Sequence, residues 1–549
     1  MSKKFYIFDS DALKNFHKRI FFSIIVFLLV CSIAIFRIAD VMLLDITTKE
    51  ISIIKQTTER GKIYDRNGQL LSSSINTYSL AVVNPKEIKH KFLLSSKLSE
   101  ILLIPNEHIL KLLNQDNKFV WIKRNISPKE HQQVINLGQI NLRTEKEIKR
   151  IYPYGPISSH IVGYVDIDNK GKAGVERGLN KKLIQGENIY LTLDINLQNA
   201  VRQELFNIID KFSADSGIAL IMNVKTGEII SMNSLPDFDP NNNNTYNENN
   251  LFNRVLQANY EMGSTFKPIT VAMGIDKKII NPNMQFDVSR PIKGTIHDFH
   301  PYDGLLDIKN IIVKSSNIGA AKIAKKIGKN NQIDFFKKIG FYEKIDINIK
   351  EAATPLGNKN NWGEMETMTI GYGHGFAITP LHLASAYSAI INEGVKVNPT
   401  ILLNDISKNK EIIIQKETSD YILKLLRAVV LETKYTGPRV KIEGYEIGGK
   451  TGTAELINHL GQYQKNANLT SFIGVLPISK PKYLVLTIIE NPKKIKEENF
   501  NITGAAVNAP LVKNIILRMI EILNIPKSKN DEILNADISV GYKNKYVTF

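Results

Sequence analysis

The run 20–36 (IFFSIIVFLLVCSIAIF) constrains this chain more than any other segment, because seventeen consecutive residues carry no charge. A spanning helix needs roughly 17–25 apolar residues, so the run is just long enough to cross a bilayer. The side chains of Arg37 and Asp40 can reach the interface, which lets the span extend to residue 44. Basic residues outnumber acidic ones before the run. The positive-inside rule therefore places the N-terminus in the cytoplasm and everything after about residue 45 outside.

Two alternatives to a permanent anchor remain open. A cleaved signal peptide would use the small residues around Ser32 and Ala34 as its cleavage site, although apolar residues continue past them. A lipoprotein signal would end at Cys31, but Val30 is bulky where a small residue is required. The length of the basic segment before the run favours the anchor over both alternatives.

The net charge of +17 first suggests a nucleic-acid partner, but the distribution of charge argues against one. The basic excess is densest in residues 45–190, beside the predicted membrane segment. Anionic lipid head groups, or polymers built on the membrane, suit that position better than nucleic acid. A general abundance of lysine along the chain accounts for part of the excess. The single cysteine, Cys31, excludes an intramolecular disulfide and any CxxC metal or redox centre.

Hydrophobic periodicity divides the rest of the chain into two parts. Residues 45–190 mix short elements, a strand at 78–83 and helices at 96–103 and 107–113, as in a stalk or pedestal. Residues 191–525 begin and end with strand patterns and have helical patterns between them. We therefore predict an α+β domain whose single antiparallel sheet is assembled from both ends of the segment. The expected strands are 217–224, 228–232, 443–448, 469–476 and 482–490, and the expected helices are 195–211, 264–278, 307–328, 380–393 and 508–524.

The predicted organisation has five segments. They are a cytoplasmic tail (1–19), a transmembrane anchor (20–44), a pedestal (45–190), a large α+β domain (191–525) and a polar C-terminal tail (526–549).

The most informative stretch is 260–268 (YEMGSTFKP), in which Ser264 and Lys267 lie on one helical face. A neutral lysine can accept the proton of a serine hydroxyl if burial or a neighbouring cation lowers its pKa. A helix that starts at the serine directs backbone N–H groups toward a developing oxyanion. Gly263 and the apolar helix that follows distinguish this match from weaker SxxK matches at Ser52, Ser407 and Ser479.

Two further patterns follow in the same domain. A hydroxyl and an amide in 315–317 (SSN) can pass a proton to a leaving amine and hold a peptide, although an ordinary helix N-cap also explains the serine. The stretch 448–455 (GGKTGTAE) places Lys450 beside hydroxyls on an expected edge strand, which suits a peptide that ends in a carboxylate. Each pattern alone is common. The ordered set SxxK, SxN and KTG, with separations of 51 and 135 residues, is specific.

This ordered set resembles the motifs of the penicillin-recognising serine transferases. Over roughly residues 20–525 the chain is similar to class B penicillin-binding proteins. Tyr152-Pro153, the stretch 160–164 and Asn317 favour the septal cell-division branch over the elongation branch. Glu261-Met262 and His374 depart from the family pattern, which often has a proline near the nucleophile. The other segments that carry the resemblance are 60–71 (RGKIYDRNGQLL), 171–186 (GKAGVERGLNKKLIQG), Asn253-Arg254, 371–373 (GYG) and 378–380 (ITP).

The resemblance implies a serine-type D-Ala-D-Ala transpeptidase with a fold like that of the serine β-lactamases, in which helices flank an antiparallel sheet. Ser264 would attack the penultimate D-Ala carbonyl of a peptidoglycan stem peptide, and Lys267 would be the general base. The resemblance implies neither a metal nor a cofactor. The remaining implied roles are proton relay for Ser315 and Lys450, substrate binding for Asn317, Thr451, Gly452 and Thr453, and an oxyanion hole for the backbone N–H groups of Ser264 and Thr453.

The implied partners are stem peptides as donor and acceptor, β-lactams as covalent inhibitors, a SEDS-type glycosyltransferase and other division proteins. The last two would be reached through the anchor and the pedestal, at the bacterial inner membrane. Three alternatives stay open: an elongation-type transpeptidase, a DD-carboxypeptidase or β-lactamase-type hydrolase, and a non-catalytic β-lactam sensor or scaffold. The stretch 297–303 (HDFHPYD) has metal-ligand residue types. Pro301 breaks a helix there and no distant third ligand is evident, so we expect a structured loop near the active-site cleft.

Overall fold

A computed structural model describes residues 10–39, 59–357, 362–405, 410–457, 462–494 and 501–528 of the chain. The chain forms two compact units, Met1–Arg60 and Gly61–Phe549. In the first unit, α1 (Ser10–Ala39) contains the predicted apolar run, and its segment His17–Ile38 is long and apolar enough to cross a membrane. At 1.5 Å per residue this segment spans about 33 Å, close to the roughly 30 Å of a bilayer core. The helix is therefore compatible with a single-pass anchor. The predicted anchor residues 40–44 and tail residues 529–549 lie outside the described residues.

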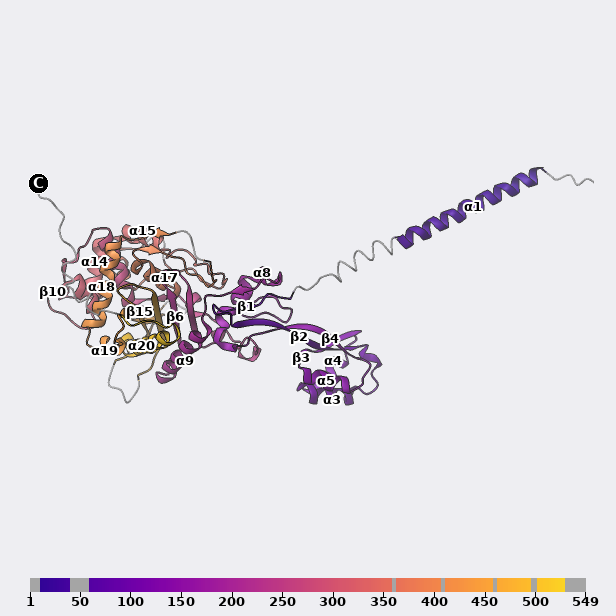
Figure 1. Cartoon of the computed structure of the whole chain (residues 1–549), viewed down its shortest axis with the longest axis horizontal. Helices are drawn as coiled ribbons and strands as arrows, with labels where there is room; N and C mark the ends of the chain where they lie inside the picture. The colour runs from indigo at the N-terminus through magenta and orange to yellow at the C-terminus, as the bar shows by residue number, and fades with distance from the viewer. Residues whose placement is uncertain are drawn as a thin grey trace, which may run out of the picture. The chain divides into compact units, whose positions relative to one another are not determined.

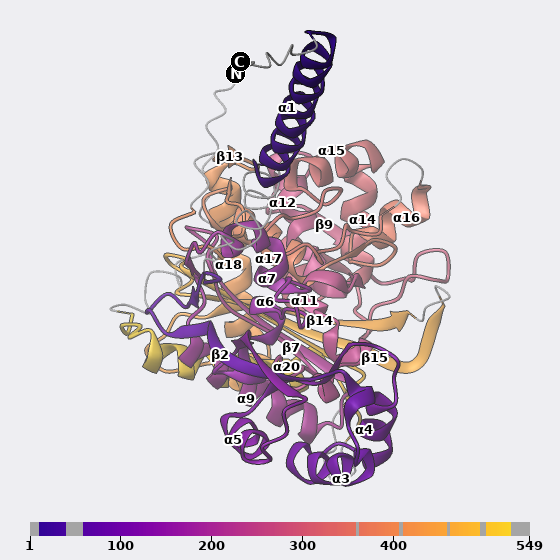
Figure 2. The same ribbon diagram turned by 90° about the vertical axis from the view of Figure 1, so that its right-hand side faces the viewer.

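The first part of the second unit is built around β2 (Leu70–Val83), which pairs antiparallel with β1 (Ile63–Tyr64), β3 (Phe119–Ile126) and β4 (Leu142–Ile151). Leu80 and Val82 on β2 pack against apolar side chains of three short helices. These helices lie close together in Figures 1 and 2, namely α3 (Lys91–Leu102), α4 (Asn106–Leu113) and α5 (Pro128–Asn136). The expected strand 78–83 lies within β2, and the two expected helices overlap α3 and α4.

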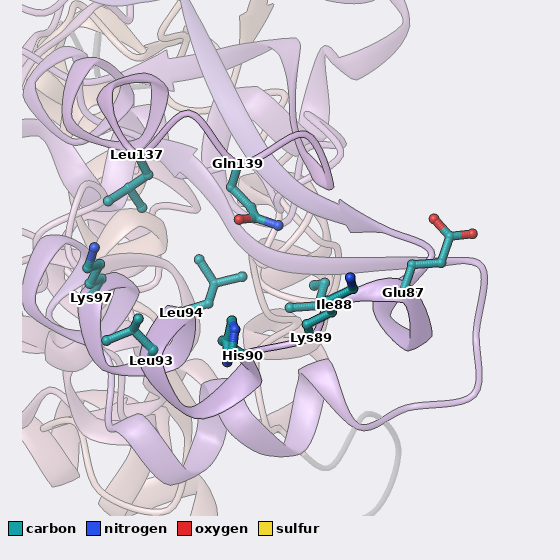
Figure 3. Close-up of a pocket in the computed structure, with 9 residues that line it drawn as sticks. All are labelled: Glu87, Ile88, Lys89, His90, Leu93, Leu94, Lys97, Leu137 and Gln139. Carbon is teal, nitrogen blue, oxygen red and sulfur yellow. The ribbon is translucent and has the colours of Figure 1, made fainter.

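A cavity of about 340 Å³ opens between the start of α3 and the segment that follows α5. In Figure 3, Leu137 and Gln139 lie on one side of it, while His90, Leu94 and Lys97 lie on the other. None of the site residues predicted from the sequence contributes to its lining.

A buried ion pair joins separate segments around the base of β2 and β4. Arg150 Nε on β4 lies 2.7 Å from Glu176 Oε1 on α7 (Gly174–Gly178), and both side chains are buried. Ser72 Oγ donates to the same carboxylate at 3.0 Å, and Arg150 Nη2 donates to Gly61 O at 2.8 Å. Because a buried charge is tolerated only when it is paired and hydrogen-bonded, this group holds the four segments in one arrangement.

The second part contains a five-stranded antiparallel sheet with the order β14-β15-β16-β6-β7. Side chains alternate between its faces, so Ile218 and Leu220 join one core cluster while Ala219 and Ile221 join the other. Helices α9 (Ile195–Lys211) and α20 (Gly504–Ile522) cover one face, and α17 (Pro380–Ile391) and α18 (Lys416–Glu432) pack on the other, as Figure 1 shows. The strands are β6 (Ser216–Asn223), β7 (Ile229–Leu235), β14 (Gly448–Ile457), β15 (Tyr463–Leu476) and β16 (Tyr483–Glu490).

The predicted assembly of the sheet from both ends of the segment is confirmed, but two expected elements are wrong in detail. The single helix expected at 307–328 is two helices, α13 (Ile308–Val313) and α14 (Asn317–Ile327), because Ser315 has a φ of 59° that interrupts the helix. The strand expected at 443–448 begins only at Gly448, since Gly444 turns the chain with a φ of 79°.

The remaining elements are mostly short, apart from the buried helix α12 (Lys267–Asp276) and the helix α15 (Lys329–Ile339). The short ones are η2 (Pro85–Glu87), η3 (Gly155–Ser158), α6 (Ser159–Val162), α8 (Asn180–Ile184), β5 (Ile189–Tyr190), η4 (Asn243–Thr245), α10 (Glu248–Leu251), α11 (Arg254–Gln257), β8 (Tyr260–Glu261), η5 (Gly263–Phe266), β9 (Gln285–Asp287), β10 (Leu305–Asp307), α16 (Glu364–Ile370), β11 (Ala377–Ile378), β12 (Val395–Lys396), β13 (Glu411–Ile412) and α19 (Gly437–Val440).

Candidate active site

Ser264 lies in the 3₁₀ turn η5, which leads directly into α12 and packs against the edge strand β14. Gly263, just before it, has a φ of 54°, and a Cβ there would lie 2.7 Å from Thr453 O. Only glycine fits both that backbone conformation and that close approach. Lys267, one turn later, is fully buried and places its Nζ 3.0 Å from Ser264 Oγ. The turn thus places the hydroxyl of Ser264 and the amine of Lys267 within hydrogen-bonding distance of each other.

The second motif contacts Lys267 directly, and the third motif is connected to it through Ser315. Lys267 Nζ lies 2.5 Å from Ser315 O, 3.2 Å from Ser315 Oγ and 2.8 Å from Asn317 Oδ1. Lys450 Nζ lies 3.0 Å from the same Ser315 Oγ. Ser315 therefore bridges two lysines that are far apart in the sequence. The left-handed backbone of Ser315 turns its carbonyl and hydroxyl toward Lys267, while Ser316 caps α14 by accepting from Gly319 N.

The electrostatics favour a neutral amine. Burial, together with the charge of Lys450, lowers the pKa of Lys267 well below its usual range. Burial also lowers the pKa of Lys450 to about 7. A neutral amine has two N–H donors, which Ser315 O and Asn317 Oδ1 accept. Its lone pair then remains for the hydroxyl proton of Ser264, as proton abstraction requires.

The strand β14 carries the third motif along the edge of the sheet. Thr451 and Thr453 alternate with Gly452, so both threonine side chains lie on the same face of the strand. A Cβ on Gly452 would lie 2.3 Å from Ser471 Oγ, which leaves no room for a side chain there. Thr453 is exposed, and its Oγ1 accepts from Gly504 N at 3.3 Å. The N–H of Ser264 lies in the first turn of η5, where helical N–H groups have no intrahelical acceptor.

Two family models match the chain. The penicillin-binding protein transpeptidase domain matches residues 217–517, which is more than half of the chain, and the penicillin-binding protein dimerisation domain matches residues 55–205. The chain belongs to the penicillin-binding proteins. Its membership in this family, expected from the three motifs, is thereby confirmed.

Curated relatives resemble this penicillin-binding protein over most of their length. It is 31% identical over 485 residues to the probable peptidoglycan D,D-transpeptidase FtsI of Caulobacter vibrioides, covering 85% of this chain and 82% of that protein. It is 30% identical over 506 residues to the probable peptidoglycan D,D-transpeptidase PenA of Neisseria meningitidis, covering 86% and 85%. The crystal structure of penicillin binding protein 3 from Mycobacterium tuberculosis, complexed with aztreonam, shares the fold with a TM-score of 0.67 and 23% identity, covering 86% of this chain and 98% of that chain.

Asp298 lies in the stretch 297–303, which the sequence predicted to be a structured loop near the cleft without giving Asp298 a role of its own. Its Oδ2 accepts from Ser316 Oγ at 2.7 Å, and its Oδ1 accepts from the backbone N–H groups of Asn317 and Ile318. A carboxylate at a helix N-terminus satisfies free N–H groups and interacts favourably with the helix dipole. Asn317 Nδ2 also donates to His297 O at 2.9 Å. The loop 297–303 thus positions the SxN motif. No group of three metal-ligating side chains occurs among the described residues.

Replacing Asp298 with asparagine should slow acylation by a fluorescent penicillin about tenfold, because hydrogen bonds to a charged acceptor contribute roughly 1.5–3 kcal/mol. The second-order rate constant for labelling measures the effect, with the melting temperature as a check on folding. Asp303→Asn, an exposed aspartate in the same loop, is the matched control and should behave like the wild type. Equal rates for the two variants would contradict the positioning role of Asp298.

Proposed function

We propose that this penicillin-binding protein cross-links peptidoglycan stem peptides at the division septum through an acyl-enzyme on Ser264. A connected series of contacts carries the proposal. Ser264 Oγ lies 3.0 Å from Lys267 Nζ, Lys267 Nζ lies 3.2 Å from Ser315 Oγ, and Ser315 Oγ lies 3.0 Å from Lys450 Nζ. Groups connected in this way can remove a proton from the nucleophile and return one to a leaving group without a metal or cofactor.

In the first half of the reaction, neutral Lys267 takes the proton of Ser264 Oγ as that oxygen attacks the penultimate D-Ala carbonyl. The backbone N–H groups of Ser264 and Thr453 bind the oxyanion that develops. The C–N bond breaks as the proton passes through Ser315 Oγ, beside Lys450, to the departing D-Ala amine. This step leaves an ester on Ser264.

The proposal also assigns the substrate contacts. The hydroxyls of Thr451 and Thr453 bind the terminal carboxylate of the donor, beside the ammonium of Lys450. Gly452 contributes through its backbone, since a Cβ there would point into the protein toward Ser471 and Thr265. Asn317 holds the acyl-side backbone through its amide. A β-lactam carries a carboxylate and a reactive amide in a similar arrangement, so it would acylate Ser264 and remain there.

In the second half, an amine from a neighbouring stem peptide attacks the ester and forms the cross-link. We propose that the N-terminus is cytoplasmic and that the catalytic part is periplasmic, from the basic residues before the apolar run 20–36. The division into 1–19, 20–44, 45–190, 191–525 and 526–549 is part of the same proposal. A SEDS-type glycosyltransferase and other division proteins are the proposed partners, reached through the anchor and pedestal. The FtsI names of several relatives fit a septal role.

Release of D-Ala from a D-Ala-D-Ala donor, measured with and without an acceptor amine, tests the reaction type. A transpeptidase should release D-Ala faster with the acceptor and form an amide-linked product detectable by mass spectrometry. A rate of D-Ala release that does not depend on the acceptor, with hydrolysed donor as the only product, would indicate a carboxypeptidase. Depletion in the parent cell tests the septal role: filaments support it, and rounded cells indicate an elongation enzyme.

A further inference from the structure

His374 and Glu261 form a carboxylate–imidazole pair beside the nucleophile. Glu261 Oε2 on β8 lies 3.4 Å from His374 Nδ1, in the turn after α16. Glu261 is buried, and it also accepts from Gly375 N at 2.8 Å and from Tyr463 OH at 3.0 Å. This carboxylate accepts from Nδ1–H of the imidazole and so fixes the orientation of the ring. The Nε2 atom of His374 then carries the lone pair.

Backbone contacts hold the residue before His374 against the residue before Ser264. Gly263, the residue before Ser264, donates its N–H to Gly373 O at 3.1 Å. A Cβ on Gly373 would lie 2.2 Å from Gly263 O, and a Cβ on Gly263 would lie 2.7 Å from Thr453 O. The turn that bears His374, the nucleophile turn and the strand β14 therefore meet at Gly263.

The charge around His374 suits a cationic partner. Glu455 follows Thr451 and Thr453 at alternate positions of β14, so its side chain continues the same row. Burial lowers the pKa of His374, whereas the charges of Glu261 and Glu455 act in the opposite direction. His374 thus contacts the carboxylate of Glu261 and is influenced by the charge of Glu455, while its lowered pKa leaves the ring neutral at neutral pH. These carboxylates repel the donor carboxylate and attract an ammonium.

The proton balance of the second half-reaction leaves one step in which such a group can act. The acceptor enters mainly as an ammonium ion, because the pKa of an aliphatic primary amine lies above neutral pH and is near 10.4 for a lysine side chain. It must lose two protons before the amide is complete. One returns to Ser264 Oγ through Lys267 and Ser315, as the ester C–O bond breaks. The other must leave on the acceptor side, before the nitrogen lone pair can attack the ester carbonyl.

We propose that His374, oriented by Glu261, accepts on its Nε2 atom the proton that the acceptor ammonium must lose before it attacks the ester. The resulting imidazolium is stabilised by Glu261 and Glu455 and releases its proton to solvent after the amide forms. The inference rests on the proposed function, and it assigns to His374 the role of general base for the acceptor. A general base of this kind contributes about 10²–10⁴-fold to a rate.

The test compares the full-length wild type with His374→Asn, whose amide N–H keeps the donor to Glu261 but removes Nε2. A thioester donor ending in a D-Ala analogue reports acylation by thiol release, and transfer to D-alanine is measured by mass spectrometry. We expect acylation by donor and by penicillin to stay within about twofold, while transfer to D-alanine falls on the order of 100-fold. His108→Asn, an exposed histidine on α4, is the matched control.

The pH profile separates a base from a merely structural residue. Transfer by the wild type should fall as pH drops through the pKa of His374, because the protonated ring accepts no proton, and His374→Asn should lack this limb. In Glu261→Gln the limb should move to lower pH, because a charge that raises the pKa of His374 is lost. The other titratable groups near the ring are Glu455 on β14, Tyr463 on β15, Lys267 on α12 and Tyr372 in the same turn.

Three results would overturn the inference. Transfer by His374→Asn at the wild-type rate, with an unchanged acid limb, would show that Nε2 takes no proton. An equal loss of acylation and transfer would indicate a structural role only. A wild type in which neither substrate acylates Ser264 would contradict the proposed function itself, and the proposal for His374 with it.

Discussion

Ser264→Ala is expected to abolish covalent labelling by a fluorescent penicillin and to lower turnover of a D-Ala-D-Ala donor by at least about 10⁴-fold. Loss of a nucleophilic serine costs about 10⁶-fold in a comparable triad enzyme, because the covalent route disappears entirely. The hydroxyl makes one side-chain contact of note, with Lys267 at 3.0 Å, so the melting temperature should change little. Gel fluorescence after incubation with the penicillin gives the readout.

The chain contains its own control for this prediction. Ser479 and Lys482 form another SxxK pair, and both side chains are exposed. Ser479→Ala should therefore be labelled like the wild type. If Ser264→Ala kept its label, or if Ser479→Ala lost it, the assignment of the nucleophile would be wrong.

Lys267→Arg is expected to slow acylation by about 10³-fold, within the range that a general base contributes. Arginine keeps several N–H donors for Ser315 and Asn317, but it stays protonated at any accessible pH and so has no lone pair for the proton of Ser264. It therefore removes the base while keeping donors at the same position. Stopped-flow measurement of penicillin acylation reports the rate. Lys482→Arg provides the matched control, since that lysine is exposed.

The pH dependence of acylation provides a second test of Lys267 as the base, because the direction of the change is fixed. Burial and the charge of Lys450 lower the pKa of Lys267, so the active form is the free amine present above that pKa. The acylation rate of the wild type should therefore rise with pH and fall as pH drops through the pKa of Lys267. Lys267→Arg should lose this limb. If the acylation rate of Lys267→Arg still fell at low pH as it does in the wild type, the base would be another group.

Much of the fold was predictable because the elements have strong local periodicity. The helix expected at 195–211 coincides with α9, and the strands expected at 469–476 and 482–490 overlap β15 and β16. Where the predictions failed, a backbone conformation interrupted a periodic pattern. Ser315 breaks the expected helix with a positive φ, and apolar spacing continues across the break, so periodicity alone did not reveal it.

The sequence by itself determined the apolar segment, the order of strands and helices, and the three motifs, because these depend on composition and spacing along the chain. Only the tertiary structure decided that Asp298 caps the SxN helix and that Glu261 faces His374. Glu261 reaches Gly375 across 114 residues of sequence, and Lys450 reaches Ser315 across 135. Such contacts form because burial forces polar groups to find partners wherever the packed elements bring them. Local spacing carries no information about which distant carboxylate will meet which donor.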